Sequence, residues 1–155
     1  MRRFARSLTG DASTADDLVQ YTAEKALKAK AKFVGSGRYR SWLFTILYRT
    51  YLDEQMRFHK RGETSIEAAA DIATAENAGA KMELQQTLLL LQKLPEELRA
   101  TLTLIAVEGF TYQEVASMTD VPIGTVMSRL HRARAKLKDL MERKAGKTAH
   151  LRTIK

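Results

Sequence analysis

The amino-acid sequence predicts an all-α protein, with two small helical domains joined by a flexible acidic linker. Apolar residues recur at helical spacing through most of the 155 residues, and only 2 prolines and 8 glycines interrupt the pattern. The linker segment, 62–80, is acidic and rich in alanine. It is too long for a loop inside a compact domain. We therefore expect domains at 1–61 and 81–142, followed by a basic tail at 143–155.

Two helices are expected in the first half. Ser13 or Thr14 can cap the first, which we expect to end near residue 32. A loop with two glycines and a serine follows. The second helix covers roughly 39–60, and Trp42 lies on its apolar stripe, so we expect Trp42 in the core.

Four helices are expected in the second half. The first ends near Leu94, and Pro95 opens the second because proline suits the first turn of a helix. Thr111 and Glu114 form a capping box at the start of the third. The fourth begins near Pro122 and carries one continuous inner stripe. The stripe consists of Val126, Leu130, Ala133, Leu137 and Leu140.

Charge is segregated along the chain. The net charge is +8, and two basic blocks, 1–61 and 129–155, flank an acidic middle. A polyanion contacted at two places explains this pattern, whereas solubilising surface charge explains only the total. The chain has no cysteine, which excludes disulfides and thiolate catalysis and suits a reducing cytoplasm. We expect no membrane insertion and no signal peptide, because no apolar run is long enough.

Residues 111–137 predict a helix–turn–helix. Ala116 supplies the small residue where the helices cross, and Val126 can lock the second helix in place. The second helix would show its N-terminal side chains to the major groove of DNA, with basic residues on the phosphates further along. A helical hairpin with a solvated basic face is the alternative. The expected DNA contacts here are Gly124, Thr125, Met127, Ser128, Arg129, His131 and Arg132.

Two patterns in the first half also point to partners. Aromatic and arginine residues are interleaved over 38–61, which is typical of single-stranded nucleic-acid binding. Asp16 and Asp17 are adjacent, so they point about 100° apart on a helix and make a poor catalytic pair. An acidic patch in a basic domain indicates a protein partner.

The histidines lack metal-ligand spacing, and we expect no metal, cofactor, small-molecule substrate or enzymatic activity.

Together these motifs resemble the extracytoplasmic-function (ECF) sigma factors of bacterial RNA polymerase. The stretches 8–27, 38–57 and 94–137 carry the resemblance, which covers nearly the whole chain. It implies two helical domains, sigma regions 2 and 4, and a role in transcription initiation in a stress or envelope response. The implied partners are core RNA polymerase, through the β′ clamp helices and the β flap, promoter DNA and an anti-sigma factor.

The resemblance also assigns roles to residues. Contact with core polymerase is implied for Asp16, Asp17, Leu18 and Gln20. Contact with the promoter −10 element is implied for Arg38, Tyr39, Arg40, Ser41, Phe44, Thr45, Tyr48, Arg49 and Arg57. For the −35 element, Thr111 and Tyr112 join the helix–turn–helix residues named above. The chain departs from the family's pattern at Thr50, where Asn is common, at Met127, where Lys is common, and in a shortened first helix.

Two other classes of protein compete with this interpretation. A stand-alone helix–turn–helix regulator explains 111–137 but leaves the acidic patch and the aromatic–arginine helix unused, and it would need a dimer interface. A sigma-like protein that only sequesters an anti-sigma factor would not need basic residues in both halves. An enzyme is the least favoured class.

Overall fold

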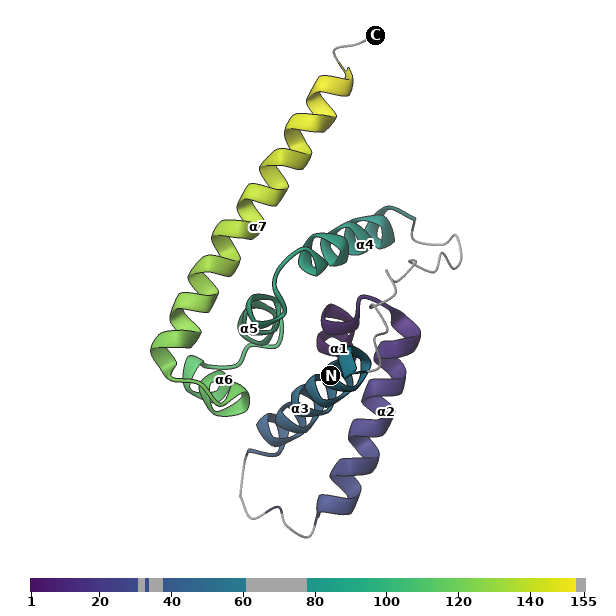
Figure 1. Cartoon of the computed structure of the whole chain (residues 1–155). Helices are drawn as coiled ribbons and strands as arrows, with labels where there is room; N and C mark the ends of the chain where they lie inside the picture. The colour runs from purple at the N-terminus through teal and green to yellow at the C-terminus, as the bar shows by residue number, and fades with distance from the viewer. Residues whose placement is uncertain (31–32, 34–37, 61–77, 153–155) are drawn as a thin grey trace.

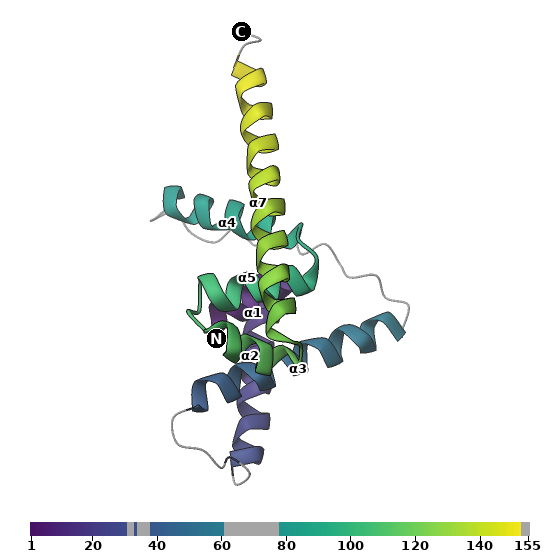
Figure 2. The same ribbon diagram turned by 90° about the vertical axis from the view of Figure 1, so that its left-hand side faces the viewer.

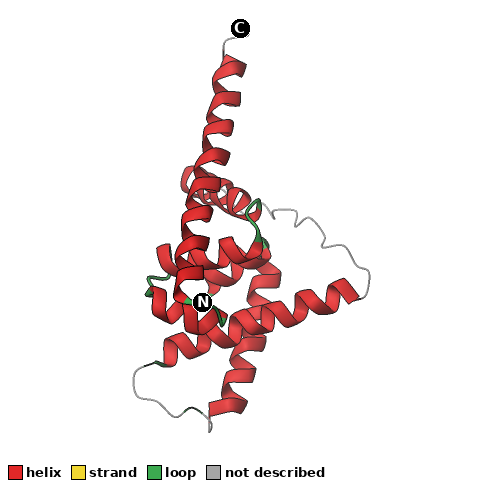
Figure 3. Cartoon of the chain, turned by 60° about the vertical axis from the view of Figure 1, so that its left-hand side comes forward, coloured by secondary structure: helices red, strands yellow, loops and turns green. Residues whose placement is uncertain are grey.

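The structure is a computed structural model of the chain, and it describes residues 1–30, 33, 38–60 and 78–152. All regular structure in these ranges is helical, as the sequence predicts (Figure 3). Most of the expected linker lies outside the described residues, but 78–80 belong to a helix. The linker is therefore shorter at its C-terminal end than we expected.

Three helices form the first half (Figure 1): α1 (Arg2–Thr9), α2 (Ala12–Ala29) and α3 (Tyr39–Lys60). We expected only two, and α1 is the helix that sequence reasoning missed. The expected cap of α2 is wrong, because Asp11 caps this helix. Its carboxylate accepts hydrogen bonds from the backbone N of Thr14 at 2.7 Å and from the Thr14 hydroxyl at 2.8 Å. A carboxylate is a stronger acceptor for this position than the hydroxyl of Ser13.

The second half has the expected four helices: α4 (Ala78–Gln92), α5 (Glu96–Ala106), α6 (Tyr112–Thr119) and α7 (Ile123–Arg152). The capping box of α6 is confirmed. The turn into α7 places Asp120 in the left-handed region, with φ 55°, which Asp adopts more readily than most residues. The expected tail is not separate, because α7 continues to Arg152. Figures 1 and 2 show α7 reaching beyond the other helices.

The two halves pack against each other and share a core. Helix α1 contacts α5, and α3 contacts α6. The Phe44 ring stacks on Phe4 from the first half, with centroids 5.6 Å apart, and meets Phe110 from the second half edge-on at 4.9 Å. These rings belong to one buried cluster that also holds Leu104 and Val126. The two halves therefore bury this cluster together.

A second cluster stabilises the second half by itself. It joins α4, α5 and α7 through buried leucines and one alanine, with Leu137 and Leu140 packed partly against it. Its buried members are Leu91, Leu94, Leu98, Leu102, Leu130 and Ala133. The predicted inner stripe of α7 is thus confirmed.

Trp42 differs from its expected place in the core. It is only half-buried, whereas Phe44, Leu47, Tyr48 and Tyr51 form the buried face of α3. Helix α3 packs against α2 and α6, and Trp42 is not among its buried residues. Among the described helices, none combines the length and the apolar character needed to cross a membrane.

Candidate functional site

An exposed face runs along the first turns of α7, where the sequence predicts contact with DNA. Val126, Leu130 and Ala133 hold the helix on the core. The opposite side is exposed, and the Met127 side chain is 49% accessible. The expected −35 residues on this exposed side are Gly124, Met127, Ser128, His131 and Arg132. Their spacing of three to four residues makes one helix face.

Three other expected −35 residues lie elsewhere. The Arg129 guanidinium bonds Glu97 of α5, with 2.8 Å between Nη2 and Oε2, and only 12% of its side chain is accessible. Tyr112 is packed against both apolar clusters, and Thr125 is half-buried. In this structure Arg129 therefore joins α7 to α5 and does not lie on the exposed face.

Thr111 begins α6 beside this face. Its hydroxyl accepts a hydrogen bond from the backbone N of Glu114 at 3.3 Å, and the Glu114 carboxylate accepts one from the backbone N of Thr111 at 2.8 Å. We expect Thr111→Ala to lower the free energy of unfolding by about 1 kcal/mol, because a helix-capping side chain is lost. Thr111→Ser keeps the hydroxyl and serves as the control. Urea denaturation measures the free energy of unfolding of both variants. If Thr111→Ser lost as much stability as Thr111→Ala, the capping role would be contradicted.

The same capping box predicts a pH effect. Hydrogen bonds from the Thr111 backbone and hydroxyl hold the pKa of Glu114 below its ordinary value of 4.5. A lowered folded-state pKa stabilises the protein above the unfolded pKa, and this stabilisation is lost as pH falls through the folded pKa. The stability difference between the wild type and Glu114→Gln should thus be largest near neutral pH and shrink in acid.

Aromatic rings cluster where α3 begins. The Tyr39 ring centroid lies 5.5 Å from those of Phe33 and Trp42, which are 5.0 Å from each other. Tyr39 and Arg38 are exposed. Sequence reasoning missed Phe33, which precedes Tyr39 by six residues and was assigned to a loop. The aromatic–arginine pattern around 38–42 was the nearest signal. Exposed rings beside an arginine suit unpaired bases.

Other expected −10 residues are buried, or lie far from the aromatic cluster, or are hydrogen-bonded within α3. Phe44 and Tyr48 are buried, and burial raises the pKa of Tyr48 to about 12. Arg57 is exposed at the far end of α3, roughly 27 Å along the helix from Tyr39 by the helical rise. Arg49 is also exposed, and the Thr45 hydroxyl donates to the carbonyl of Ser41 within α3.

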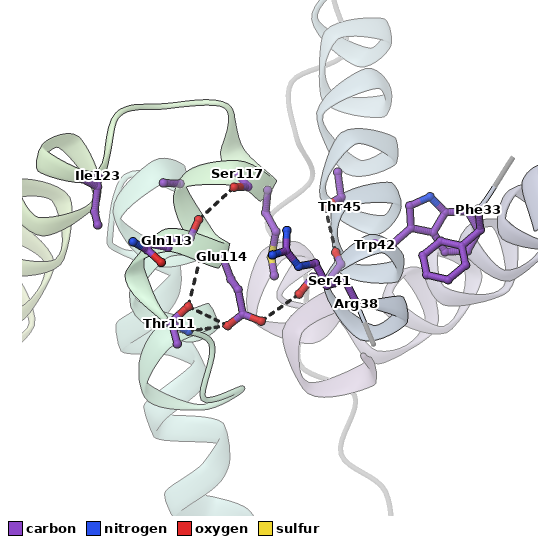
Figure 4. A pocket seen from close by; sticks show the side chains of 12 residues that line it. Phe33, Arg38, Ser41, Trp42, Thr45, Thr111, Gln113, Glu114, Ser117 and Ile123 are labelled. Carbon is purple, nitrogen blue, oxygen red and sulfur yellow. Dashed lines mark hydrogen bonds between the residues drawn. The ribbon is translucent and has the colours of Figure 1, made fainter. Parts of the chain in front are cut away.

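A cleft of about 800 Å³ separates the start of α3 from α6. Figure 4 shows Trp42, Phe33 and Arg38 on one side of it, and Thr111 and Gln113 on the other. The two sides are bridged by Ser41, whose hydroxyl donates to the Glu114 carboxylate at 3.1 Å. The cleft thus brings parts of the expected −10 and −35 sites face to face.

A second groove, of about 370 Å³, lies between α2 and the end of α3. Acidic, basic and aromatic side chains line it: Thr14, Asp17, Leu18, Tyr21, Glu54, Arg57 and Phe58. Burial raises the pKa of Glu54, and the negative charge of Asp17 raises this pKa further. The positive charge of Lys25 is the main effect that lowers it. Exposed Tyr21 follows Asp17 by four residues, a spacing that could have marked the groove from sequence.

The expected polymerase-binding residues divide into two groups. Asp16, Asp17 and Gln20 are exposed on α2, and Asp16 pairs with Arg2 at 3.0 Å. Leu18 is buried in the core, although it also lines the floor of the groove. Within the described residues, no three His, Cys, Asp or Glu side chains gather closely enough to hold a metal ion.

Two protein families match the chain. Residues 84–137 match Sigma-70, region 4, and residues 1–48 match the Sigma2 domain of PhyR. The ECF RNA polymerase sigma factor EcfG of Rhodopseudomonas palustris is 34% identical over 91% of this chain and 78% of its own length. The ECF RNA polymerase sigma-E factor of Escherichia coli is 32% identical over 76% of this chain and 69% of its own length.

Solved structures are similar across both halves. The sigma factor RpoE of Bartonella quintana, in complex with the anti-sigma factor NepR, gives a TM-score of 0.78 at 34% identity, covering 91% of this chain and 89% of that one. CnrH in complex with the cytosolic domain of CnrY gives 0.70 at 27% identity, covering 91% and 79%.

Proposed function

Because this chain belongs to the extracytoplasmic-function sigma factors of bacterial RNA polymerase, we propose that it joins core polymerase and directs it to promoters in a stress or envelope response. The observation that carries the proposal is that one short chain holds three separate surfaces. These are the α2–α3 groove, the aromatic–arginine cluster at the start of α3, and the exposed face of α7. A stand-alone regulator would use only the last.

The α2–α3 groove is the surface we assign to core polymerase. Asp17 offers an exposed carboxylate at its edge, and Tyr21 and Phe58 add partly exposed rings. Aromatic anchors beside a charged rim are typical of protein interfaces. We assign this groove to the clamp helices of β′, and the second half to the β flap.

The two remaining surfaces are assigned to promoter DNA. The Phe33, Tyr39 and Trp42 rings with Arg38 suit the unpaired bases of a melted −10 element. The exposed face of α7 suits the major groove at the −35 element, with Ser128 and nearby side chains at base edges.

We also infer an anti-sigma partner. The Bartonella quintana relative was crystallised with its anti-sigma factor, and its similarity to this chain extends over both halves. A partner that covers both halves would block several surfaces at once. The chain would meet both this partner and RNA polymerase in the bacterial cytoplasm.

Transcription in vitro tests the proposal. Purified bacterial core polymerase is incubated on a promoter library with and without this chain, and we expect transcripts from a defined promoter class only when both proteins are present. A protein that merely sequesters an anti-sigma factor would yield no transcripts. Tight, selective binding of promoter DNA by a dimer of the free chain would favour a stand-alone regulator.

Lys136 on α7 allows a narrower test of DNA contact. It is exposed beyond the first turns of the helix, where we expect it to meet a phosphate. Lys136→Ala should weaken binding to all sequences alike and reduce the slope of log affinity against log salt by about 0.9. Lys93→Ala removes another exposed lysine, from the turn before α5, and should leave the slope unchanged. If Lys136→Ala had the same salt slope as the wild type, the contact between Lys136 and a phosphate would be contradicted.

A further inference from the structure

The exposed face of α7 consists of two neighbouring rows of side chains, because residues four apart lie above one another on a helix. One row is Gly124, Ser128 and Arg132, and the other is Ile123, Met127 and His131. Ile123 and Met127 are apolar and yet 41% and 49% accessible. The helix assigned to DNA therefore carries an apolar strip beside a polar one.

Met127 is the apolar side chain of this strip that has no place in the protein interior. Ile123 lines the cleft beside α6 (Figure 4), whereas Met127, one turn further on, belongs to neither apolar cluster of the described residues. A single exposed methionine is ordinary on a protein surface, and Met141 of the same helix is another. Met127 differs from Met141 because it lies on the face that we assign to the major groove.

The polar neighbours of Met127 are held in place by the helix itself. The Ser128 hydroxyl donates to the backbone carbonyl of Thr125 at 3.0 Å, and Arg132 Nε donates to the backbone carbonyl of Ser128 at 3.3 Å. The hydroxyl hydrogen of Ser128 is thus engaged, and its oxygen can accept a hydrogen bond from a base. Arg132 lies back along the helix, so its guanidinium stays on the face that carries Met127.

Gly124 lets another surface approach α7 closely, one turn before Ser128. No atom from outside its own stretch of helix lies within 4 Å of the place that a Cβ would take at Gly124. Packing within the protein therefore does not require glycine here, although glycine weakens a helix relative to alanine. A surface outside the protein, such as the floor of the major groove, can come closer to this bare backbone than to a side chain. The following turn, with Met127 and Ser128, would then reach the edges of the bases.

The major groove offers Met127 one apolar group, the C5 methyl group of thymine, whereas the other groups at the base edges are hydrogen-bond donors and acceptors. Contact between a methionine side chain and this methyl group removes both from water and is favourable. Against a donor or an acceptor, the same side chain would displace water without replacing its hydrogen bond. Met127 therefore favours a T·A pair. Exposed basic side chains further along α7 attract the phosphates of the duplex, and these are Arg134, Lys136 and Lys138.

We propose that Met127 determines part of the promoter specificity of this chain by contacting one thymine methyl group in the major groove of the −35 element. The inference deepens the proposed function and rests on it, since the DNA contact of α7 belongs to that proposal. Lysine, which is common at this position in the ECF pattern, would place a charged end there in place of an apolar one. Met127 thus gives up attraction for a phosphate and gains preference for one base pair.

Replacement of thymine by uracil tests the methyl contact without changing the protein, because uracil lacks only the C5 methyl group. The preferred site is first selected from a randomised duplex library, with the full-length chain alone at low salt and with the chain bound to core polymerase. Each thymine of the selected site is then replaced in turn by deoxyuridine, and the affinity is measured by fluorescence anisotropy. For one thymine we expect about fourfold weaker binding, the effect of leaving one methyl group unburied.

Variants of the chain identify the residue that makes the contact. Met127→Ala should bind the thymine and deoxyuridine duplexes alike, and Met127→Lys should do the same with a salt slope steeper by about 0.9. Met141→Ala removes a methionine that is 55% accessible and lies roughly 21 Å further along α7 by the helical rise, so it should keep the fourfold ratio. Ser128→Ala should weaken binding to both duplexes and also keep the ratio.

The methyl contact would be overturned by equal affinity of the wild type for the thymine and deoxyuridine duplexes at every position. A ratio that survives in Met127→Ala, or is lost equally in Met141→Ala, would overturn it too, as would a selected site without thymine or a chain that binds no duplex DNA. Transcription in vitro separates this inference from the proposed function. A methyl-dependent site in a chain that directs no transcription would refute the sigma-factor assignment and leave the contact standing, whereas transcription without any methyl effect would refute the contact alone.

Discussion

Asp17→Arg is expected to weaken association of the chain with core RNA polymerase on the order of a hundredfold, because a like charge placed against a complementary partner surface costs several kcal/mol. Asp17 is exposed at the edge of the α2–α3 groove, so the change should leave the fold intact. Surface plasmon resonance with immobilised core polymerase measures the affinity, and circular dichroism checks the helices.

Glu142→Arg is the matched control for this prediction. Glu142 is exposed on α7, far along the helix from the groove, and it makes only a loose contact of 3.9 Å with Lys138. The substitution changes the net charge by the same amount. If both variants lost affinity alike, the effect would come from net charge, and the groove would not be the polymerase contact.

Phe44→Ala is expected to lower the free energy of unfolding by about 3–5 kcal/mol, the usual cost of truncating a buried phenylalanine. Phe44 is 2% accessible and touches rings from both halves, Phe4 and Phe110. A residue that served only to contact DNA would be lost at little cost in stability. Urea denaturation therefore distinguishes a core role for Phe44 from a role in DNA contact alone.

Phe58→Ala is the control on the same helix. Phe58 is 46% accessible at the far end of α3, and its loss should cost less than about 1 kcal/mol. Similar losses at Phe44 and Phe58 would show that the shared core is not a major source of stability.

Local signals explain which predictions held. The expected bounds of α3 match the structure because a glycine-containing loop and a long apolar stripe mark that helix in the sequence. The capping box of α6 is a pattern of two residues three apart, Thr111 and Glu114, and it needs no distant contact. The buried stripe of α7 follows from helical spacing alone.

Burial within a site was harder to predict. Leu18 and Phe44 are in segments that the sequence assigns to partners, and both are buried in the core. Arg129 is placed early in the helix that we expect to meet DNA, but it turns toward Glu97 of α5. In each case a partner from another helix decides which way the side chain points.

By itself, the sequence determined the all-helical class, six of the helices found in the described residues and the family, but it missed α1. Capping residues, helical spacing and the order of motifs are properties of neighbouring residues. Tertiary structure alone decided that the halves share one core and that Arg40 is held by Glu108. An apolar stripe predicts that one face of a helix is buried, but it does not predict which other helices cover that face. That choice depends on contacts such as Phe4–Phe44–Phe110, between residues far apart in the chain.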